Sequence, residues 1–261
     1  MRLFLIVLLL SFQLWPLPAT AASEAVSSIR LCADDAQWPP FSYTDENGVM
    51  AGYTVAMIAR ISARLGIHIQ IDQLPWKRCL AAVQDGSHYQ VAIDASASPE
   101  REQAYLLSRP YYQLTPYYFY SRRHFSEGIN IQRGQQLAQF GTVCGLPGYN
   151  YSNFALGQTT VYTGSQDFYA LAAMIQRGRC ALFIGRYEIV AGMARIGNDL
   201  FSDPELSYGP IPDAQAEPFY LLISRNIAAS EDLKAMFDSA IEAMSQSGEL
   251  DQLRRDYLLP Q

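Results

Sequence analysis

Short apolar runs alternate with amphipathic segments along most of this 261-residue chain, and this alternation restricts the fold more than any other feature. The apolar runs at 29–33, 68–74 and 91–93 are typical of buried strands. Between them, in segments 55–65 and 76–85, apolar residues recur at helical spacing. Strands that alternate with helices form parallel sheets with right-handed crossovers. The sequence therefore predicts an α/β protein.

A second series of the same kind begins at Gly141. It is predicted to contain strands 142–144, 159–162 and 181–184, a helix from the turn at Pro147-Gly148 to Leu156, and a helix capped by Ser165. A tyrosine-rich strand at 111–122 precedes this series, and a strand at 219–224 follows it. These two strands would let the chain cross to a second lobe and return. The chain then ends in a long helix that Ser230 can cap and a shorter helix after Gly248.

The first 22 residues have the features of a secretory signal peptide. Met1-Arg2 precedes the apolar run 3–14, and small residues up to Ala22 form the expected cleavage site. We therefore expect export and a mature chain that starts near residue 22 or 23. Removing Arg2 leaves 18 of the 19 basic residues against 25 acidic ones, a net charge of −7, which argues against a nucleic-acid partner.

Four cysteines in an exported chain can form two disulfides. Cys32 and Cys79 fall in the first half and Cys144 and Cys180 in the second, so pairing within each half is the simplest of the three connectivities. Buried free thiols remain the alternative. Neither the cysteines nor the three histidines have the spacing of a metal site, and we expect no metal and no cofactor.

The stretch 91–112 has the pattern of a ligand site. An apolar strand is followed by the small polar residues 94–98 and by Pro99-Glu100-Arg101, which is typical of a helix start. Hydroxyls, backbone N–H groups and a guanidinium would meet at a strand's carboxyl end, where open α/β sheets bind ligands. The residues alone leave open a second interpretation, an exposed loop with a solvated Arg101.

Several motifs occur in an order that resembles the family 3 bacterial extracellular solute-binding proteins, which include periplasmic amino-acid-binding components of ABC transporters. They are Asp35-x-x-Trp38-Pro39-Pro40-Phe41, Gly52-Tyr53, Leu65-Gly66, the serine-rich turn before Arg101, and Ser108-Arg109-Pro110-Tyr111. The resemblance implies a two-lobed, type II periplasmic-binding-protein-like fold. Each lobe would be a mostly parallel sheet flanked by helices, joined to the other by two crossing hinge strands. We expect lobe one to comprise 23–115 and 222–261, and lobe two 116–221.

The resemblance also implies a monomeric periplasmic protein that closes on a small polar solute, such as an amino acid or a related carboxylate or amine compound. Its partner would be an ABC permease in the inner membrane. A separate sensor protein is the alternative partner, and a periplasmic enzyme similar to cyclohexadienyl dehydratases is the alternative function. The sequence contains no G-x-S-x-G motif, and we expect a protein that is not an enzyme.

Carried over by position, the family's site predicts five ligand-binding residues in lobe one. Arg101 matches the arginine that binds a ligand carboxylate, and Ser96 matches a hydroxyl beside it. Asp35 matches an acid at the mouth of the cleft, Trp38 an aromatic cover, and Trp76 a wall residue. For both tryptophans the alternative is a structural role at the lobe edge.

Lobe two departs from the family pattern. Tyr149 and Asn150 stand after Gly148, where the family has small hydroxyl residues at a helix start. Arg186 occupies the position of the aspartate that binds a ligand ammonium. In lobe one, Asp94 replaces a small residue, and its carboxylate could pair with Arg101.

Three explanations for these departures remain open. The ligand is not an ordinary α-amino acid, and Arg186 binds an acceptor on it. Alternatively, the alignment is shifted by one or two residues and Glu188 binds the amine. In the third explanation, Arg186 and Asp94 form ion pairs that do not contact the ligand.

Overall fold

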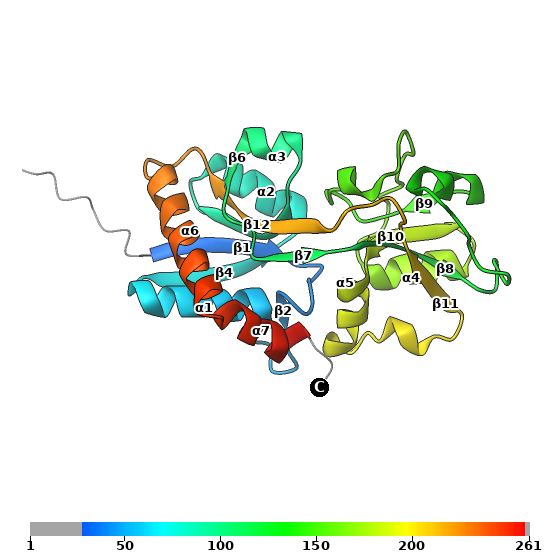
Figure 1. Cartoon of the computed structure of the whole chain (residues 1–261), viewed down its shortest axis with the longest axis horizontal. Helices are drawn as coiled ribbons and strands as arrows, with labels where there is room; N and C mark the ends of the chain where they lie inside the picture. The colour runs from blue at the N-terminus through cyan, green and yellow to red at the C-terminus, as the bar shows by residue number, and fades with distance from the viewer. Residues whose placement is uncertain (1–27, 259–261) are drawn as a thin grey trace, which may run out of the picture.

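The structure is a computed structural model that describes residues 28–258. The expected signal peptide, residues 1–22, lies outside the described residues. The described chain forms two lobes, each built on its own sheet, and two strands run between them (Figure 1). The two-lobed α/β architecture expected from the sequence is confirmed.

The first lobe contains a six-stranded sheet whose central strands follow the predicted order. β1 (Ser28–Asp34) pairs in parallel with β4 (His68–Leu74) and with β5 (Val91–Ser96). Helices α1 (Tyr53–Leu65) and α2 (Trp76–Asp85) connect them. Because apolar residues recur at helical spacing, each helix buries one face against the core of this lobe.

The C-terminal helices return to the first lobe and pack beside α1 (Figure 1). The helix α6 is confirmed, but its N-cap is Ala229, so Ser230 does not cap it. The remaining elements of this lobe are β2 (Tyr43–Thr44), β3 (Met50–Ala51), α3 (Pro99–Ala104), β6 (Tyr105–Leu107), α6 (Ser230–Gln246) and α7 (Glu249–Leu258).

The second lobe contains a four-stranded sheet in the order β11-β8-β10-β9. Here β8 pairs antiparallel with both neighbours, because the chain enters this sheet from the other lobe, and only β9 and β10 are parallel. The elements are β8 (Pro116–Ser121), β9 (Val143–Cys144), α4 (Phe168–Gln176), β10 (Leu182–Arg186), α5 (Tyr187–Gly192) and β11 (Leu206–Pro210). Four short 3-10 helices complete the lobe at Gly134–Phe140, Ser152–Phe154, Met193–Ile196 and Leu200–Ser202.

Three predicted details of the second lobe are wrong. The helix expected to end at Leu156 is only the 3-10 turn Ser152–Phe154, and the strand expected at 159–162 is a single bridge between Tyr162 and Cys144. Asp167, not Ser165, caps α4, because its carboxylate accepts the Ala170 N–H at 2.7 Å. In this lobe, contacts between distant segments determine these elements more than the local sequence pattern does.

Two strands connect the lobes. The chain leaves the first lobe through β7 (Tyr112–Leu114) and β8, and it returns through β12 (Glu217–Ser224). β7 and β12 pair antiparallel, with Leu114 opposite Glu217. The tyrosine-rich segment predicted as one strand is therefore two strands that meet at Thr115, one in each sheet.

β5 is longer than predicted, because it pairs with β12 as far as Ser96. Ala92 lies opposite Leu222 and Ala95 opposite Tyr220, so β5 contains one extra residue at this point, which is a β-bulge. Asp94 lies in the bulge with φ of 58°, a left-handed conformation that aspartate tolerates better than most residues. Because the bulge interrupts the regular alternation of side chains along β5, the Asp94 side chain points in a direction that a regular strand would not give it.

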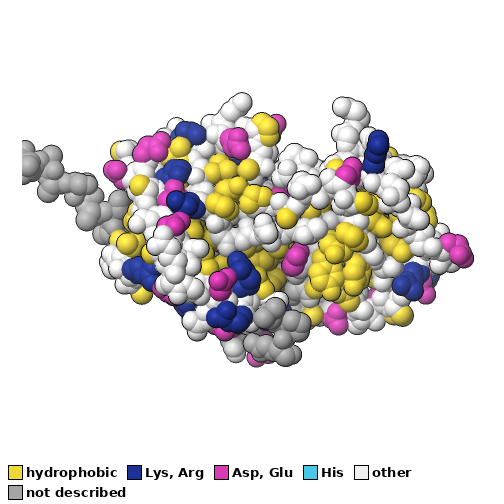
Figure 2. All heavy atoms as spheres, viewed as in Figure 1, with side chains coloured by type: hydrophobic (Ala, Val, Ile, Leu, Met, Phe, Trp, Pro, Cys, Tyr) yellow, Lys and Arg dark blue, Asp and Glu magenta, His cyan; other side chains and the backbone are white. Residues whose placement is uncertain are grey.

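On the face of the molecule shown in Figure 2, the two lobes carry different kinds of side chain. Acidic and basic side chains are mixed over the first lobe, whereas hydrophobic side chains gather over α5 of the second. Tyr187, the first residue of α5, belongs to an aromatic cluster with Tyr117, Phe201 and Tyr208, whose ring centroids lie between 4.9 and 6.1 Å apart. Tyr117 belongs to β8 and Tyr208 to β11.

Both disulfides expected from the sequence are confirmed. Cys32 in β1 bonds Cys79 in α2, and Cys144 in β9 bonds Cys180 just before β10. Each bond therefore lies within one lobe and joins segments 47 and 36 residues apart in the sequence.

Replacing Cys32 and Cys79 together by serine is expected to lower the free energy of unfolding by about 4 kcal/mol, because the unfolded chain gains the freedom that a loop of this length otherwise loses. Urea unfolding of the oxidised protein and of the double variant measures the difference. The Cys144→Ser, Cys180→Ser variant should lose a comparable amount. A change under about 0.5 kcal/mol for both pairs would show that neither bond constrains the unfolded chain.

Candidate functional site

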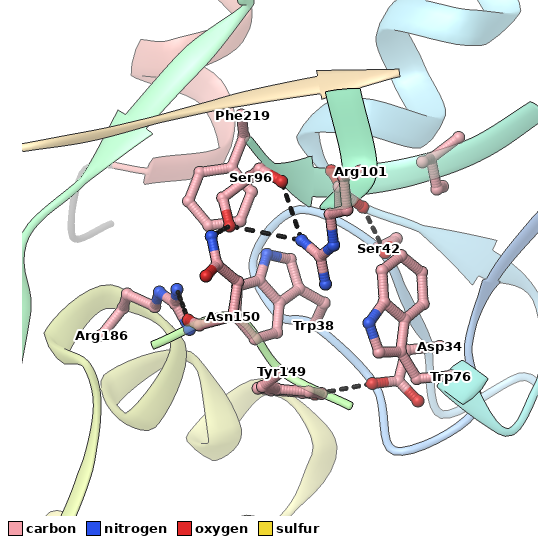
Figure 3. Close-up of a pocket in the computed structure, with 12 residues that line it drawn as sticks. Asp34, Trp38, Ser42, Trp76, Ser96, Arg101, Tyr149, Asn150, Arg186 and Phe219 are labelled. Carbon is pink, nitrogen blue, oxygen red and sulfur yellow. Dashed lines mark hydrogen bonds between the residues drawn. The ribbon is translucent and has the colours of Figure 1, made fainter. Parts of the chain in front are cut away.

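The lobes meet around a small cavity of about 20 Å³, within an empty space of about 350 Å³ that includes open solvent. Eight of the nine predicted site residues line it: Trp38, Trp76, Asp94, Ser96, Arg101, Tyr149, Asn150 and Arg186 (Figure 3). The remaining lining residues, which the sequence did not single out, are Asp34, Ser42, Ile93 and Phe219. The structure thus brings the candidates of both lobes together, and their contact with a ligand stays a prediction.

Arg101 enters the cavity from the first turn of α3. Ser98 accepts the Arg101 backbone N–H at 3.2 Å and Pro99 occupies the first turn, which explains why the helix starts here. The guanidinium donates to the Ser96 carbonyl at 2.8 Å and, across the cleft, to the Gly148 carbonyl at 3.2 Å. Burial lowers the pKa of Arg101 to about 10, so the group stays charged at neutral pH.

Arg101 forms no salt bridge with any carboxylate of residues 28–258. The expected pairing of Asp94 with Arg101 is therefore wrong. The reason is the bulge in β5, which directs the Asp94 carboxylate toward hydroxyl groups instead. The Arg101 guanidinium lies over the Trp76 ring, 5.6 Å from its centroid, which stabilises the cation without neutralising it.

Asp94 accepts hydrogen bonds from four hydroxyls. They belong to Ser42 at 2.6 Å, Thr54 at 2.5 Å, Tyr111 at 3.1 Å and Tyr112 at 3.0 Å. Burial raises the pKa of Asp94, while these four bonds act in the opposite direction. Its carboxylate is thus engaged by the first lobe itself.

Arg186, at the end of β10, pairs with Glu217, the first residue of β12. Its Nε donates to the Glu217 carboxylate at 2.9 Å and its Nη2 donates to the same oxygen. The side chains are 2% and 0% exposed, so the pair is fully buried. Sequence reasoning missed Glu217, because 31 residues separate the partners and a glutamate before Pro218-Phe219 carries no motif.

Asp34, one residue before the predicted Asp35, is the acid that lines the cavity. It accepts the Tyr149 hydroxyl at 2.6 Å and the Ala36 N–H at 3.0 Å. Burial raises its pKa from 3.8 to about 6, against the effect of these bonds. Asp35 is exposed and lines a neighbouring opening that includes Lys77. Successive residues at a strand end point in opposite directions, and the sequence does not fix which of the two faces the cleft.

The lobes are hydrogen-bonded directly to one another around the cavity. Asn150 donates to the Ser96 hydroxyl at 3.0 Å and to the Ala97 carbonyl at 2.6 Å. Tyr149 also packs edge-on against Trp38, with centroids 5.4 Å apart. The structure therefore describes a closed arrangement of the two lobes.

Glu188, the alternative candidate for an amine, does not line this cavity. It lies in a groove beside the crossing strands, with Leu114 and Pro218. Burial raises its pKa. Its position gives no support to the explanation in which Glu188 replaces Arg186 in the site.

Residues 28–258 contain no group of three or more His, Cys, Asp or Glu side chains placed to bind a metal ion. Among the helices of that part of the chain, none is long and apolar enough to cross a membrane.

The raised pKa of Asp34 makes the free energy of unfolding depend on pH. Between about pH 4 and 6 the unfolded chain loses the proton that folded Asp34 retains, so stability falls by about 3 kcal/mol as the pH rises. In Asp34→Asn this decrease should be absent, since asparagine does not ionise. Urea unfolding at pH 4, 5, 6 and 7 tests this, and parallel pH curves for the two proteins would contradict it.

The fold is shared with solved structures of low sequence identity. One is an ancestral amino acid-binding protein described as a precursor of cyclohexadienyl dehydratase, with a TM-score of 0.70 and 18% identity over 89% of this chain and 96% of that one. Another is EhuB in complex with hydroxyectoine, with a TM-score of 0.74 and 17% identity over 90% of this chain and 89% of that one. At these identities the likeness shows the type II periplasmic-binding-protein fold alone.

A protein of Haemophilus influenzae named probable amino-acid ABC transporter-binding protein is 25% identical over 81 residues. The match spans 31% of this chain and about a third, 32%, of that relative. The sequence pattern of the bacterial extracellular solute-binding proteins, family 3, matches residues 29–260, which include both lobes and both crossing strands. This chain therefore belongs to the bacterial extracellular solute-binding proteins, family 3.

Proposed function

We propose that this protein captures a small carboxylate-bearing solute between its lobes and delivers it to an ABC importer in the inner membrane. The observation that carries the proposal is Arg101, a buried cation without a carboxylate partner in the described chain, at the wall of a cavity between two lobes. Buried charges in proteins are normally paired. A ligand carboxylate would supply the missing partner and form charge-assisted hydrogen bonds with Arg101 and Ser96.

The periplasm is the compartment that we propose. Two disulfides are stable in an oxidising compartment, and the family is described as extracellular. The name of the Haemophilus influenzae relative supports an ABC importer as the partner. We also propose that the protein acts as a monomer, with lobe one formed by 23–115 and 222–261 and lobe two by 116–221.

A dehydratase is the second candidate function, and Asp34 is the observation that favours it. A buried carboxyl group with a pKa of about 6 can protonate a leaving hydroxyl. The ancestral structure described as a precursor of cyclohexadienyl dehydratase has the same fold. Turnover of prephenate or arogenate, lost in Asp34→Asn, would establish this function in place of transport.

Replacing Arg101 by alanine should weaken ligand binding by about a hundredfold, because a charged hydrogen-bond partner of the ligand is lost. The ligand is first identified by a thermal-shift screen of amino acids, dicarboxylates, polyamines and aromatic acids, since a solute that binds the folded state raises its stability. Calorimetry then compares the variants. Arg109→Ala is the matched control, because Arg109 is exposed and pairs with Glu242. Equal affinity of Arg101→Ala and wild type would contradict the proposed site.

Replacing Gly148 by alanine should weaken ligand binding by about tenfold, because the new side chain destabilises the closed state of the two lobes. A Cβ at this position would lie 2.8 Å from Lys77 Cγ of the other lobe, and φ is +80°. Gly197→Ala is the control, because φ is +79° there but nothing lies within 4 Å of the new Cβ. Removing the clash by Lys77→Ala should restore part of the affinity. An equal effect of the two glycine variants would show that backbone strain, not lobe closure, is responsible.

A further inference from the structure

We propose that the solute of this cavity is an anion without an ammonium group, namely a small carboxylic acid with a flat, apolar body. The inference rests on the proposed function and adds the chemical class of its ligand. It departs from the zwitterionic amino acid that the order of sequence motifs suggests.

The carboxylates that line the cavity already accept hydrogen bonds from the protein, Asp94 most of all. Both carboxylates that line the cavity, Asp34 and Asp94, accept protein donors on each oxygen. On Asp94 three hydroxyls share one oxygen, which leaves that oxygen no free lone pair. At that oxygen an ammonium would have to displace a hydroxyl and leave it unpaired in a buried site.

The position at which the resemblance places an ammonium-binding aspartate carries a cation instead. Arg186 lines the cavity there, and its charge is neutralised from behind by Glu217. The second Glu217 oxygen accepts from Asn150 at 3.4 Å and from Asn153 at 3.1 Å. Glu217 is therefore engaged on both oxygens and does not line the cavity, so at this position the cavity is lined by an arginine and not by an acid.

The aromatic rings, which could otherwise bind a ligand cation, already bind cations of the protein. The Arg186 guanidinium carbon lies 5.6 Å from the Trp38 ring centroid and 5.5 Å from that of Phe219. The Arg101 guanidinium lies over Trp76. A second cation at these rings would approach a guanidinium of like charge. What the rings of Trp38, Trp76 and Phe219 offer a ligand is apolar aromatic surface (Figure 3).

The charge of Arg101 also favours an anionic ligand. Arg101 remains protonated at neutral pH, and it forms no salt bridge with a carboxylate of residues 28–258. Its Nη atoms donate to Ser96 and Gly148, whereas its Nε donates to no acceptor among the residues described. The unmet requirement of the cavity is therefore for an anion.

The test compares acids that differ only in the ammonium group. The pairs are 3-phenylpropionate with L-phenylalanine, 3-(4-hydroxyphenyl)propionate with L-tyrosine, and 4-methylpentanoate with L-leucine. Calorimetry on the wild-type protein at pH 7 should show, in at least one pair, that the acid without the ammonium binds at least tenfold more tightly. That binding should disappear in Arg101→Ala and persist in Arg109→Ala.

Two outcomes would overturn the inference, and they have different consequences for the proposed function. If the amino acids bind as tightly as their partners and lose affinity in Arg101→Ala, the cavity accepts an ammonium and the proposed function stands. If no member of any pair binds, the class of ligand is wrong. The wider thermal-shift screen then decides the proposed function separately, because it fails only when no carboxylate raises the stability of the protein.

Discussion

A buried ion pair between Arg186 and Glu217 holds together the parts of the second lobe that face the cavity. Taking two charges out of water costs several kcal/mol for each ion, and their attraction offsets this only where the other donors and acceptors are also satisfied. Here they are, because Arg186 also donates to the Asn150 carbonyl at 3.0 Å and Glu217 accepts from Asn150 and Asn153. The end of β10, the start of β12 and the loop at 150 are thereby fixed as one unit.

The same unit reaches the first lobe through few contacts. Asn150, fixed by the ion pair, donates to Ser96 and Ala97, while Arg101 donates in the other direction to Gly148. Each such bond contributes about 1 kcal/mol in net terms, and two crossing strands are the covalent connection between the lobes among the described residues. A ligand that bridges Arg101 and Asn150 could therefore stabilise the closed arrangement by its own contacts.

The sequence predicted the layout of the site better than its chemistry. Strand and helix periodicity placed Arg101, Trp76 and Arg186 at element ends, and in parallel sheets those ends meet on one side. Pairing between distant segments could not be predicted from the sequence. No local pattern links Arg186 to Glu217 or reveals the bulge that turns Asp94 away from Arg101. The same limit explains why Asp35 was chosen over Asp34: a difference of one residue at a strand end reverses the direction of the side chain.

Asp94 orients other side chains of the cavity wall through its hydrogen bonds. One of its hydroxyl partners, Tyr112, stacks between Phe41 and Phe219, with centroids 3.9 and 4.8 Å away. The Tyr112 oxygen also accepts the Trp38 indole N–H at 3.0 Å. An acceptor at Asp94 thus orients Tyr112, and Tyr112 orients Trp38 at the cavity wall. Because the Tyr112 hydroxyl accepts from the indole and donates its own proton to Asp94, an acceptor at this position fixes the direction of both bonds.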